Sequence, residues 1–124
     1  MPLIAPTVTQ VESIYGHVNS VVWGPFAAGD TFTPYQNAGQ ADRSVHVYGT
    51  FSGSTITIVG SNEFTATLSA PTSLVALHDP TNVAISVAAA AIVQVLEVTE
   101  WIAPVVTGGT GSALFVAMIC RKTL

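Results

Sequence analysis

Few side chains in this sequence could carry acid–base or nucleophilic chemistry, and their spacing matches no catalytic pattern. The three histidines are His17, His46 and His78, and seven carboxylates are scattered along the chain. Consecutive side chains of a strand face opposite sides, so His78 and the adjacent Asp79 do not predict a catalytic pair or a metal site. We expect Asp79, which precedes Pro80, to cap its own turn, and His46 to face solvent or an interface.

No motif of a familiar enzyme class occurs: there is no G-x-S-x-G elbow, no H-E-x-x-H and no P-loop. The glycine-rich run Gly108-Gly109-Thr110-Gly111 lacks the lysine and the following helix of a phosphate-binding loop, so we interpret it as a hairpin loop. Cys120 is the single cysteine and is expected to be a small buried residue. We therefore predict that the protein is not an enzyme and holds no cofactor and no metal ion.

Aromatic side chains are the other residues that could recognise a ligand. Several gather in a segment rich in glycine and proline between residues 23 and 35, and Trp101 follows a later strand pattern. Exposed Trp and Tyr rings would form a sugar-binding platform, whereas aromatics also dominate protein cores and interfaces. We favour the second interpretation. With two apolar residues near the N-terminus, the candidate interface residues are Leu3, Ile4, Trp23, Phe26, Tyr35 and Trp101.

The composition points to a single domain with a covered surface. The chain has 124 residues, and its three basic and seven acidic residues make ten charged side chains, or 8%. An ordinary soluble domain has about 25%. Apolar residues make up 49%, which is too many for a disordered chain. We therefore expect much of the surface to be covered by copies of the same chain or by another protein.

The charges also argue against two classes of partner. Only Arg43, Arg121 and Lys122 are positive, too few for the phosphate contacts that nucleic-acid binding requires. The longest apolar stretch, residues 83–98, is shorter than the ~20 residues of a membrane-spanning helix, and polar residues interrupt it. The first residues lack the basic and apolar regions of a signal peptide. We expect no nucleic-acid, membrane or small-molecule partner.

Hydropathy that alternates with a period of two predicts strands along most of the chain. Residues 44–51 alternate with Val45, Val47 and Phe51 on one side, and residues 55–60 alternate again. Ser52-Gly53-Ser54 separates the two runs and favours a turn, so we predict a β-hairpin here. Further strands are predicted at residues 8–15, 18–23, 65–68, 74–77, 82–87, 92–99 and 114–120.

Turn-forming residues separate these strands. The last strand, 114–120, is apolar on both faces, which indicates a central or covered position. We expect a turn at 88–91, and an extended N-terminal arm at residues 1–6 that packs on a neighbouring copy. Residues 7–124 are predicted to form one antiparallel, jelly-roll-like β-sandwich. Further turns are predicted at Gly16-His17, Gly24-Pro25, Gly29-Asp30, Asn37-Ala38-Gly39, Gly60-Ser61-Asn62 and Asp79-Pro80.

Several stretches between residues 41 and 122 share their pattern and order with a known family. They are Ala41-Asp42-Arg43-Ser44-Val45-His46-Val47-Tyr48-Gly49-Thr50-Phe51, Thr55-Ile56-Thr57-Ile58-Val59-Gly60-Ser61-Asn62, Leu77-His78-Asp79-Pro80, Val93-Gln94-Val95-Leu96-Glu97-Val98, Trp101-Ile102-Ala103-Pro104-Val105-Val106-Thr107-Gly108-Gly109 and Met118-Ile119-Cys120-Arg121-Lys122. The chain thereby resembles small β-sandwich virion proteins of tailed bacteriophages, and in particular head decoration (cement) proteins.

This resemblance implies a structural role. A decoration protein is made in the host bacterial cytoplasm, binds the outside of the assembled head and stabilises it, so the implied partners are the major capsid protein and the chain itself, as a homotrimer. The implied location is the capsid surface of the virion. Two alternatives are another virion module, associated with a tail, neck or fibre, and a sugar-binding β-sandwich.

Overall fold

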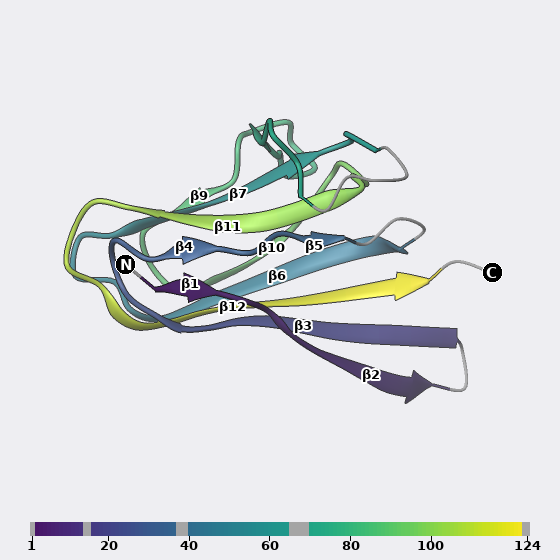
Figure 1. Cartoon of the computed structure of the whole chain (residues 1–124), viewed down its shortest axis with the longest axis horizontal. Coiled ribbons are helices and arrows are strands. Elements are labelled where there is room, and N and C mark those ends of the chain that lie inside the picture. Colours follow the sequence, from purple (N-terminus) through teal and green to yellow (C-terminus); the bar gives the residue numbers. More distant parts are fainter. Residues whose placement is uncertain (1, 14–15, 37–39, 65–69, 123–124) are drawn as a thin grey trace.

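The computed structural model describes residues 2–13, 16–36, 40–64 and 70–122, and within them the chain is all-β. Two layers of mainly antiparallel strands lie against each other in a sandwich-like arrangement (Figure 1). The predicted antiparallel β-sandwich is therefore confirmed, whereas its jelly-roll character stays a prediction.

One layer, which we call sheet I, has five strands in the order β10-β6-β12-β3-β2. β12 lies between β6 and β3, so the apolar strand predicted at 114–120 is central, as expected. The strands of sheet I are β2 (Thr7–Ser13), β3 (Gly16–Phe26), β6 (Gln40–Thr50), β10 (Ala91–Gln94) and β12 (Ser112–Lys122).

The other layer, sheet II, has the order β5-β11-β7-β8, and β9 also pairs with β7. A short parallel pair, β1 (Leu3–Ile4) with β4 (Thr31–Phe32), accompanies the two sheets. The strands of sheet II are β5 (Tyr35–Gln36), β7 (Thr55–Ser61), β8 (Val75–Ala76), β9 (Ser86–Val87) and β11 (Trp101–Thr107).

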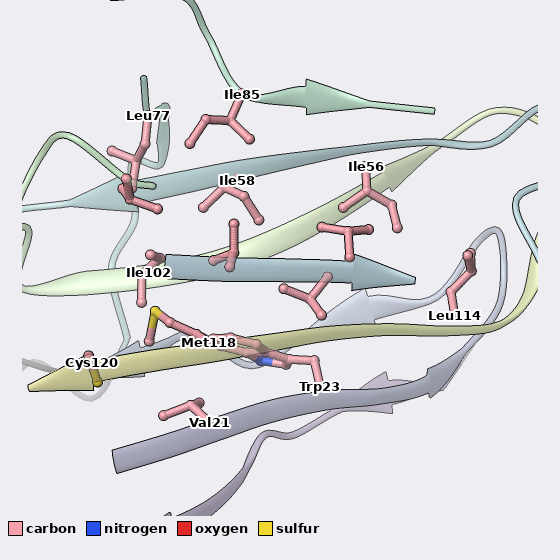
Figure 2. Close-up of a cluster of buried hydrophobic side chains, with 14 of the residues drawn as sticks. Val21, Trp23, Ile56, Ile58, Leu77, Ile85, Ile102, Leu114, Met118 and Cys120 are labelled. Carbon is pink, nitrogen blue, oxygen red and sulfur yellow. The ribbon is translucent and has the colours of Figure 1, made fainter. Parts of the chain in front are cut away.

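The core lies between the two sheets and is built from alternate residues of their long strands (Figure 2). Side chains at every second position of a strand share a face, so each amphipathic strand contributes one buried row. Burying an aliphatic side chain of this size contributes roughly 1.5–3 kcal/mol. The buried rows include Val45 and Val47 of β6, Ile56 and Ile58 of β7, Val21 and Trp23 of β3, and Leu114, Val116, Met118 and Cys120 of β12.

The predicted hairpin at 44–60 is wrong, although both of its strands form. β6 pairs with β10 and β12 in sheet I, while β7 pairs with β8, β9 and β11 in sheet II. The turn between them is tight, because Ser54 N donates a hydrogen bond to Phe51 O at 2.8 Å. Alternation determines which side of each strand is buried but not its partner, and here the two buried sides face each other across the core.

The loop at 108–111, predicted to close a hairpin, also joins the two sheets, because β11 and β12 lie in different sheets. It is bonded to the β6–β7 turn: Ser54 Oγ donates to Gly108 O at 2.8 Å, and Gly111 N donates to Ser54 Oγ at 2.9 Å. Gly109 has a φ of 63°, and a Cβ there would lie 2.2 Å from Ser54 N, so a glycine is required. Two crossing loops thus close this end of the sandwich.

Several predicted turns lie inside strands. Gly24-Pro25, which forms a cis peptide bond, is part of β3, and β3 already begins at Gly16. Gly60 and Ser61 belong to β7. The turn at Asp79-Pro80 is confirmed, and the chain bends at 88–89, but Ala91, predicted in the same turn, already begins β10. The predicted strand 65–68 and the turn at 37–39 lie outside the described residues.

The predicted strand 92–99 is shortened to β10 because the chain leaves one sheet for the other. Val95 N still donates to Arg43 O of β6, but the next amide, Leu96 N, donates to His78 O on the side of sheet II. The strands predicted at 74–77 and 82–87 are likewise shortened to β8 and β9, linked by an isolated bridge between His78 and Ala84.

The N-terminal arm is extended, as predicted, but its hydrogen bonds are made within the chain. Thr31 N donates to Pro2 O at 3.1 Å, and Thr33 N donates to Ile4 O at 2.9 Å. Ile4 also packs against the core, while Leu3 is 65% exposed. The backbone of the arm pairs with β4 of the same chain, while Pro2, Leu3 and Ala5 are exposed, and the packing of the arm on a neighbour stays a prediction.

Candidate interaction surface

The outward side of sheet I is the broadest regular surface of the described chain. Residues directly opposite each other in an antiparallel pair point to the same side of the sheet. In β12 the residues of the buried row alternate with Phe115, Ala117 and Ile119, which therefore point away from the core.

The register carries this outward side across all five strands. Ile119 lies opposite Ser44 of β6 and Ser20 of β3, and β2 and β10 extend the rows at both edges. We call this surface the outer face. Its described residues are Thr7, Thr9, Val18, Ser20, Val22, Ser44, His46, Tyr48, Ile92, Gln94, Phe115, Ala117, Ile119 and, opposite Val18, Arg121.

Among these described residues Arg121 is the only charged one, and it lies at the end of the face. Asp42 lies beside Arg121 at this end, where the β6–β12 pairing shifts its register. Arg121 Nε lies 3.6 Å from Asp42 Oδ2, and both side chains are more than half exposed. A surface ion pair of this kind contributes only about 0–1 kcal/mol, but it leaves the end of the face electrically balanced.

Three rings form an aromatic row on the outer face. Tyr48 and Phe115 stack with ring centroids 5.0 Å apart and an interplanar angle of 11°, and His46 lies 4.7 Å from Tyr48. Phe115 lies against the backbone of β3, because a Cβ added to Gly24 would be only 2.6 Å from its ring. Packed aromatic rings with one open side are typical of interface anchors.

The rest of the outer face combines protruding aliphatic side chains with small ones. Ile92 is 70% exposed and Ile119 is 45% exposed. Ile119 stands between Ser44 and Ser20, and Ala117 occupies the next outward position of the same strand. The surface therefore has ridges and shallow hollows rather than a pocket.

The side of sheet II has a different character. An open groove of about 450 Å³ runs beside β7 and β8, and Glu63, His78 and Glu97 are among its lining residues. His78 donates its backbone N–H to Glu97 Oε1 at 2.7 Å, and its Nδ1 lies 2.5 Å from Glu97 Oε2. Burial raises the pKa of Glu97, but the hydrogen bonds from His78 outweigh it and leave the pKa below its ordinary value.

Glu63 braces the loop beside this groove. Its carboxylate accepts hydrogen bonds from the Thr72 hydroxyl and amide, from Ser73 N and from Ser61 Oγ. These bonds, that of the Thr72 hydroxyl first, lower the pKa of Glu63 from 4.5 to about 2. Its oxygens are therefore occupied by the chain itself, which gives Glu63 a structural function.

Exposed aliphatic side chains surround the groove, mixed with acids. We call this surface the groove side. Its carboxylates are Glu63, Asp79, Glu97 and Glu100, and its exposed aliphatics are Leu74, Val75, Val83, Leu96 and Val98. Within the four described stretches, no three His, Cys, Asp or Glu side chains lie together as they would around a metal ion. The described part of the chain also contains no helical segment with the length and apolar character of a membrane span.

Of the residues expected at an interface, three lie inside the chain. Trp23, Phe26 and Trp101 are at most 5% exposed, and the indole N–H of Trp23 donates to Thr33 O at 2.9 Å. Tyr35 is half-buried beside Gln40. Ile4 is half-buried against the core, so Leu3 is the most exposed of the six. The structure thus brings the aromatic segment into the core instead of onto a partner surface.

The outer face was not predicted as a site, although the sequence contained a signal for it. The strand 114–120 is apolar on both sides, and its outward residues Phe115 and Ile119 belong to the outer face. His46 and Tyr48 were assigned to the polar side of their strand. Only the register shows that these side chains from separate strands form one surface.

Arg43 is not a surface cation, because it occupies the buried side of β6. It is 1% exposed, and its Nη1 donates to Thr99 Oγ1 at 2.9 Å while Nη2 donates to Thr99 O. Desolvation lowers the pKa of Arg43 from its ordinary value. Arg43 thereby connects β6 of sheet I to the segment that leads into sheet II. Its side chain lies on the same side of β6 as those of Val45 and Val47.

Comparison with protein-family models, with curated proteins and with solved structures finds no match to this chain.

Proposed function

We propose that this protein is a bacteriophage head decoration protein, which binds the outside of the assembled capsid and stabilises it through extended protein–protein contacts. The observation that carries the proposal is the outer face: a five-stranded surface with a packed aromatic row, exposed isoleucines and, among its described residues, a single charged side chain, Arg121, which is paired with Asp42. Such a surface suits permanent contact with protein better than contact with water.

Two further observations support a structural role. The resemblance of residues 41–122 to virion β-sandwich proteins supplies the kind of assembly, with the major capsid protein and the chain itself as partners. The closed end of the sandwich, where Ser54 bonds to the 108–111 loop, supplies rigidity. A rigid face loses little conformational entropy when it binds, so more of the contact energy remains as affinity.

Different observations distinguish the two alternatives from a decoration protein. The sugar-binding alternative relied on Trp23 and Trp101 as exposed rings, but both are buried. A tail, neck or fibre module would use the same kind of contact surface as a decoration protein. Copy number separates these two: a decoration protein is present in hundreds of copies per particle, and a tail or neck component in few.

The test is to add the purified protein to capsids assembled without it and to free capsid subunits. We expect saturable binding to assembled capsids at a fixed ratio, no binding to free subunits, and capsids that resist heat better once decorated. Quantitative mass spectrometry of virions should find hundreds of copies. A low copy number would favour the tail or neck alternative, and no affinity for capsids together with absence from virions would contradict the proposal.

A further inference from the structure

We infer that the N-terminal arm is exchanged between copies, so that β1 of one copy pairs with β4 of the next copy. We call residues 31–33, which hold the arm, the arm-binding site. The inference rests on the proposed function for the presence of neighbouring copies, and it names a segment that links them in addition to their surface contacts. It is carried by the arm-binding site, by the connection of the arm to β2 and by the exposed side chains of the arm.

The arm-binding site is fixed by residues outside the arm. The ring of Phe32 lies edge-on to Phe26 of β3, with ring centroids 4.7 Å apart and an interplanar angle of 85°. Thr33 O accepts a hydrogen bond of 2.9 Å from the indole N–H of the buried Trp23. Each copy therefore presents the same preformed site, whichever chain supplies the arm.

The arm itself is held by a short pairing. β1 and β4 share two residue pairs, Leu3 with Thr31 and Ile4 with Phe32, and Ile4 packs against the core. A strand pairing of this length can open locally at a small fraction of the free energy of global unfolding. The same segment of a neighbouring copy can then take the place of the arm and remake the same contacts.

The connection from the arm to β2 suits such an exchange. Proline restricts itself and the residue before it to extended conformations, and Ala5-Pro6 joins the two strands. Figure 1 shows the chain passing from β1 into β2 without folding back. An arm that leaves its site therefore stays extended and loses little conformational entropy when it binds the next copy.

The length of this connection limits where the next copy lies. Three residue steps lead from Ile4 to Thr7, and they span at most about 10 Å. The arm-binding site of the next copy must therefore lie close to the start of β2. This position is open to a neighbour, because β2 is the outermost strand of sheet I.

The exposed side chains of the arm favour the exchanged form over the closed one. Leu3 is 65% exposed within one chain, and Pro2 and Ala5 are exposed as well. An arm that bridges two copies lies at their contact, where these apolar side chains are removed from water. None of them is charged, so covering them requires no desolvation of a charge.

Exchange also agrees with the homotrimer that the resemblance implies. Each copy donates one arm and receives one, which is a head-to-tail contact, and head-to-tail contacts close into rings. In a ring of three copies every arm has a site and every site has an arm.

A disulfide between the arm and its site tests the inference. Leu3 and Thr31 lie opposite each other and are both exposed, and paired strands are about 4.8 Å apart, which is within disulfide range. Leu3→Cys chains and Thr31→Cys chains, one kind carrying a larger tag, are produced together, purified and mildly oxidised. Cys120 is fully buried and does not compete.

We expect a covalent pair of one chain of each kind, and covalent three-chain rings when one chain carries both cysteines. Leu3→Cys chains alone are the control and should stay single. No mixed pair, together with a double variant that closes only on itself, would overturn the inference. If that double variant still decorates capsids, the proposed function stands without the exchange, whereas a lack of affinity for capsids contradicts the proposed function wherever the disulfide forms.

A matched pair of surface variants gives a second readout. Leu3 and Val83 are 65% and 58% exposed, but only Leu3 lies on the arm. We expect Leu3→Asp to raise the dissociation constant of the oligomer by about 10-fold or more and Val83→Asp by less than about threefold, with unchanged circular dichroism in both. A Leu3→Asp protein that associates like wild type would contradict the inference.

Discussion

The outer face of sheet I and the groove side of sheet II differ in both regularity and chemistry. The outer face is regular, with the stacked Tyr48 and Phe115 at one end and its single charged residue among those described, Arg121, at the other. The groove side is irregular, has only short strands at its edge, and combines carboxylates with exposed aliphatics. The difference indicates that low charge is not spread evenly over the molecule but is concentrated where we place the protein contact.

The irregularity of the groove side also has a physical reason. β8 and β9 are two residues long, so the segment 72–90 is held by isolated backbone bonds, such as Leu77 N to Ile58 O, and by side-chain bonds, such as those of Glu63 to Thr72 and of Glu97 to His78. The outer face is instead held by continuous strand pairing. A partner that binds by area needs the second kind of surface, because it does not have to order loops when it binds.

The largest expected effect comes from comparing a substitution on the buried side of β6 with one on its outward side. Val47 is fully buried, whereas His46, its neighbour, lies on the outer face. Val47→Asp puts an unpaired charge into the core and should cost about 4 kcal/mol or more, a large part of the 5–15 kcal/mol that stabilises a typical domain. His46→Ala should cost less than about 1 kcal/mol. Equal melting temperatures of the two variants would show that the inside and outside of the strand are misassigned.

A smaller effect should distinguish the outer face from the groove side in self-association. Ile92 on the outer face and Val83 on the groove side are 70% and 58% exposed, so lysine should be tolerated at both without unfolding. We expect Ile92→Lys to weaken self-association by about 10-fold or more, because the lysine loses water at the contact, and Val83→Lys to change it by less than about threefold. Sedimentation velocity over a concentration series measures both. A larger loss for Val83→Lys would move the contact to the groove side.

The smallest effect concerns pH and the groove side alone. The pKa of Glu63 is about 2 in the folded chain against an ordinary 4.5, so its hydrogen bonds stabilise the fold fully above pH 4.5. That contribution is lost progressively as the pH falls from 4.5 towards 2. Urea unfolding of wild type and Glu63→Gln should therefore differ most at pH 6 and converge near pH 2. A difference that does not shrink with falling pH would show that the carboxylate does not brace this loop.

The sequence predicted the strands better than their partners. The alternation of residues 44–51 identified β6 and its buried side, Val45 and Val47. It did not distinguish a hairpin from a crossing between sheets, because both leave one side of each strand buried. Arg43 lies two residues before Val45, so alternation alone would have placed its side chain in the same buried row. Its burial was not predicted, because the strand was expected to begin only at residue 44.

The outer face could not be predicted in the same way, because it is a non-local property. Ser20, His46 and Ala117 are unremarkable one by one, and only the register of β3, β6 and β12 places them side by side. An interface was predicted at the aromatic residues instead, because such side chains are typical of protein contacts. Trp23 and Trp101 are buried, and their N–H groups bond to the chain itself, at Thr33 O and Glu63 O.

Hydroxyl-radical footprinting of the assembled and the dissociated protein tests most directly whether the outer face is the covered surface. We predict that Tyr48, Phe115 and Ile119 lose most of their oxidation on assembly, while Val75 and Leu96 on the groove side keep theirs. Oxidation of Tyr48, Phe115 and Ile119 that is unchanged by assembly, with protection of Val75 and Leu96 in its place, would contradict it.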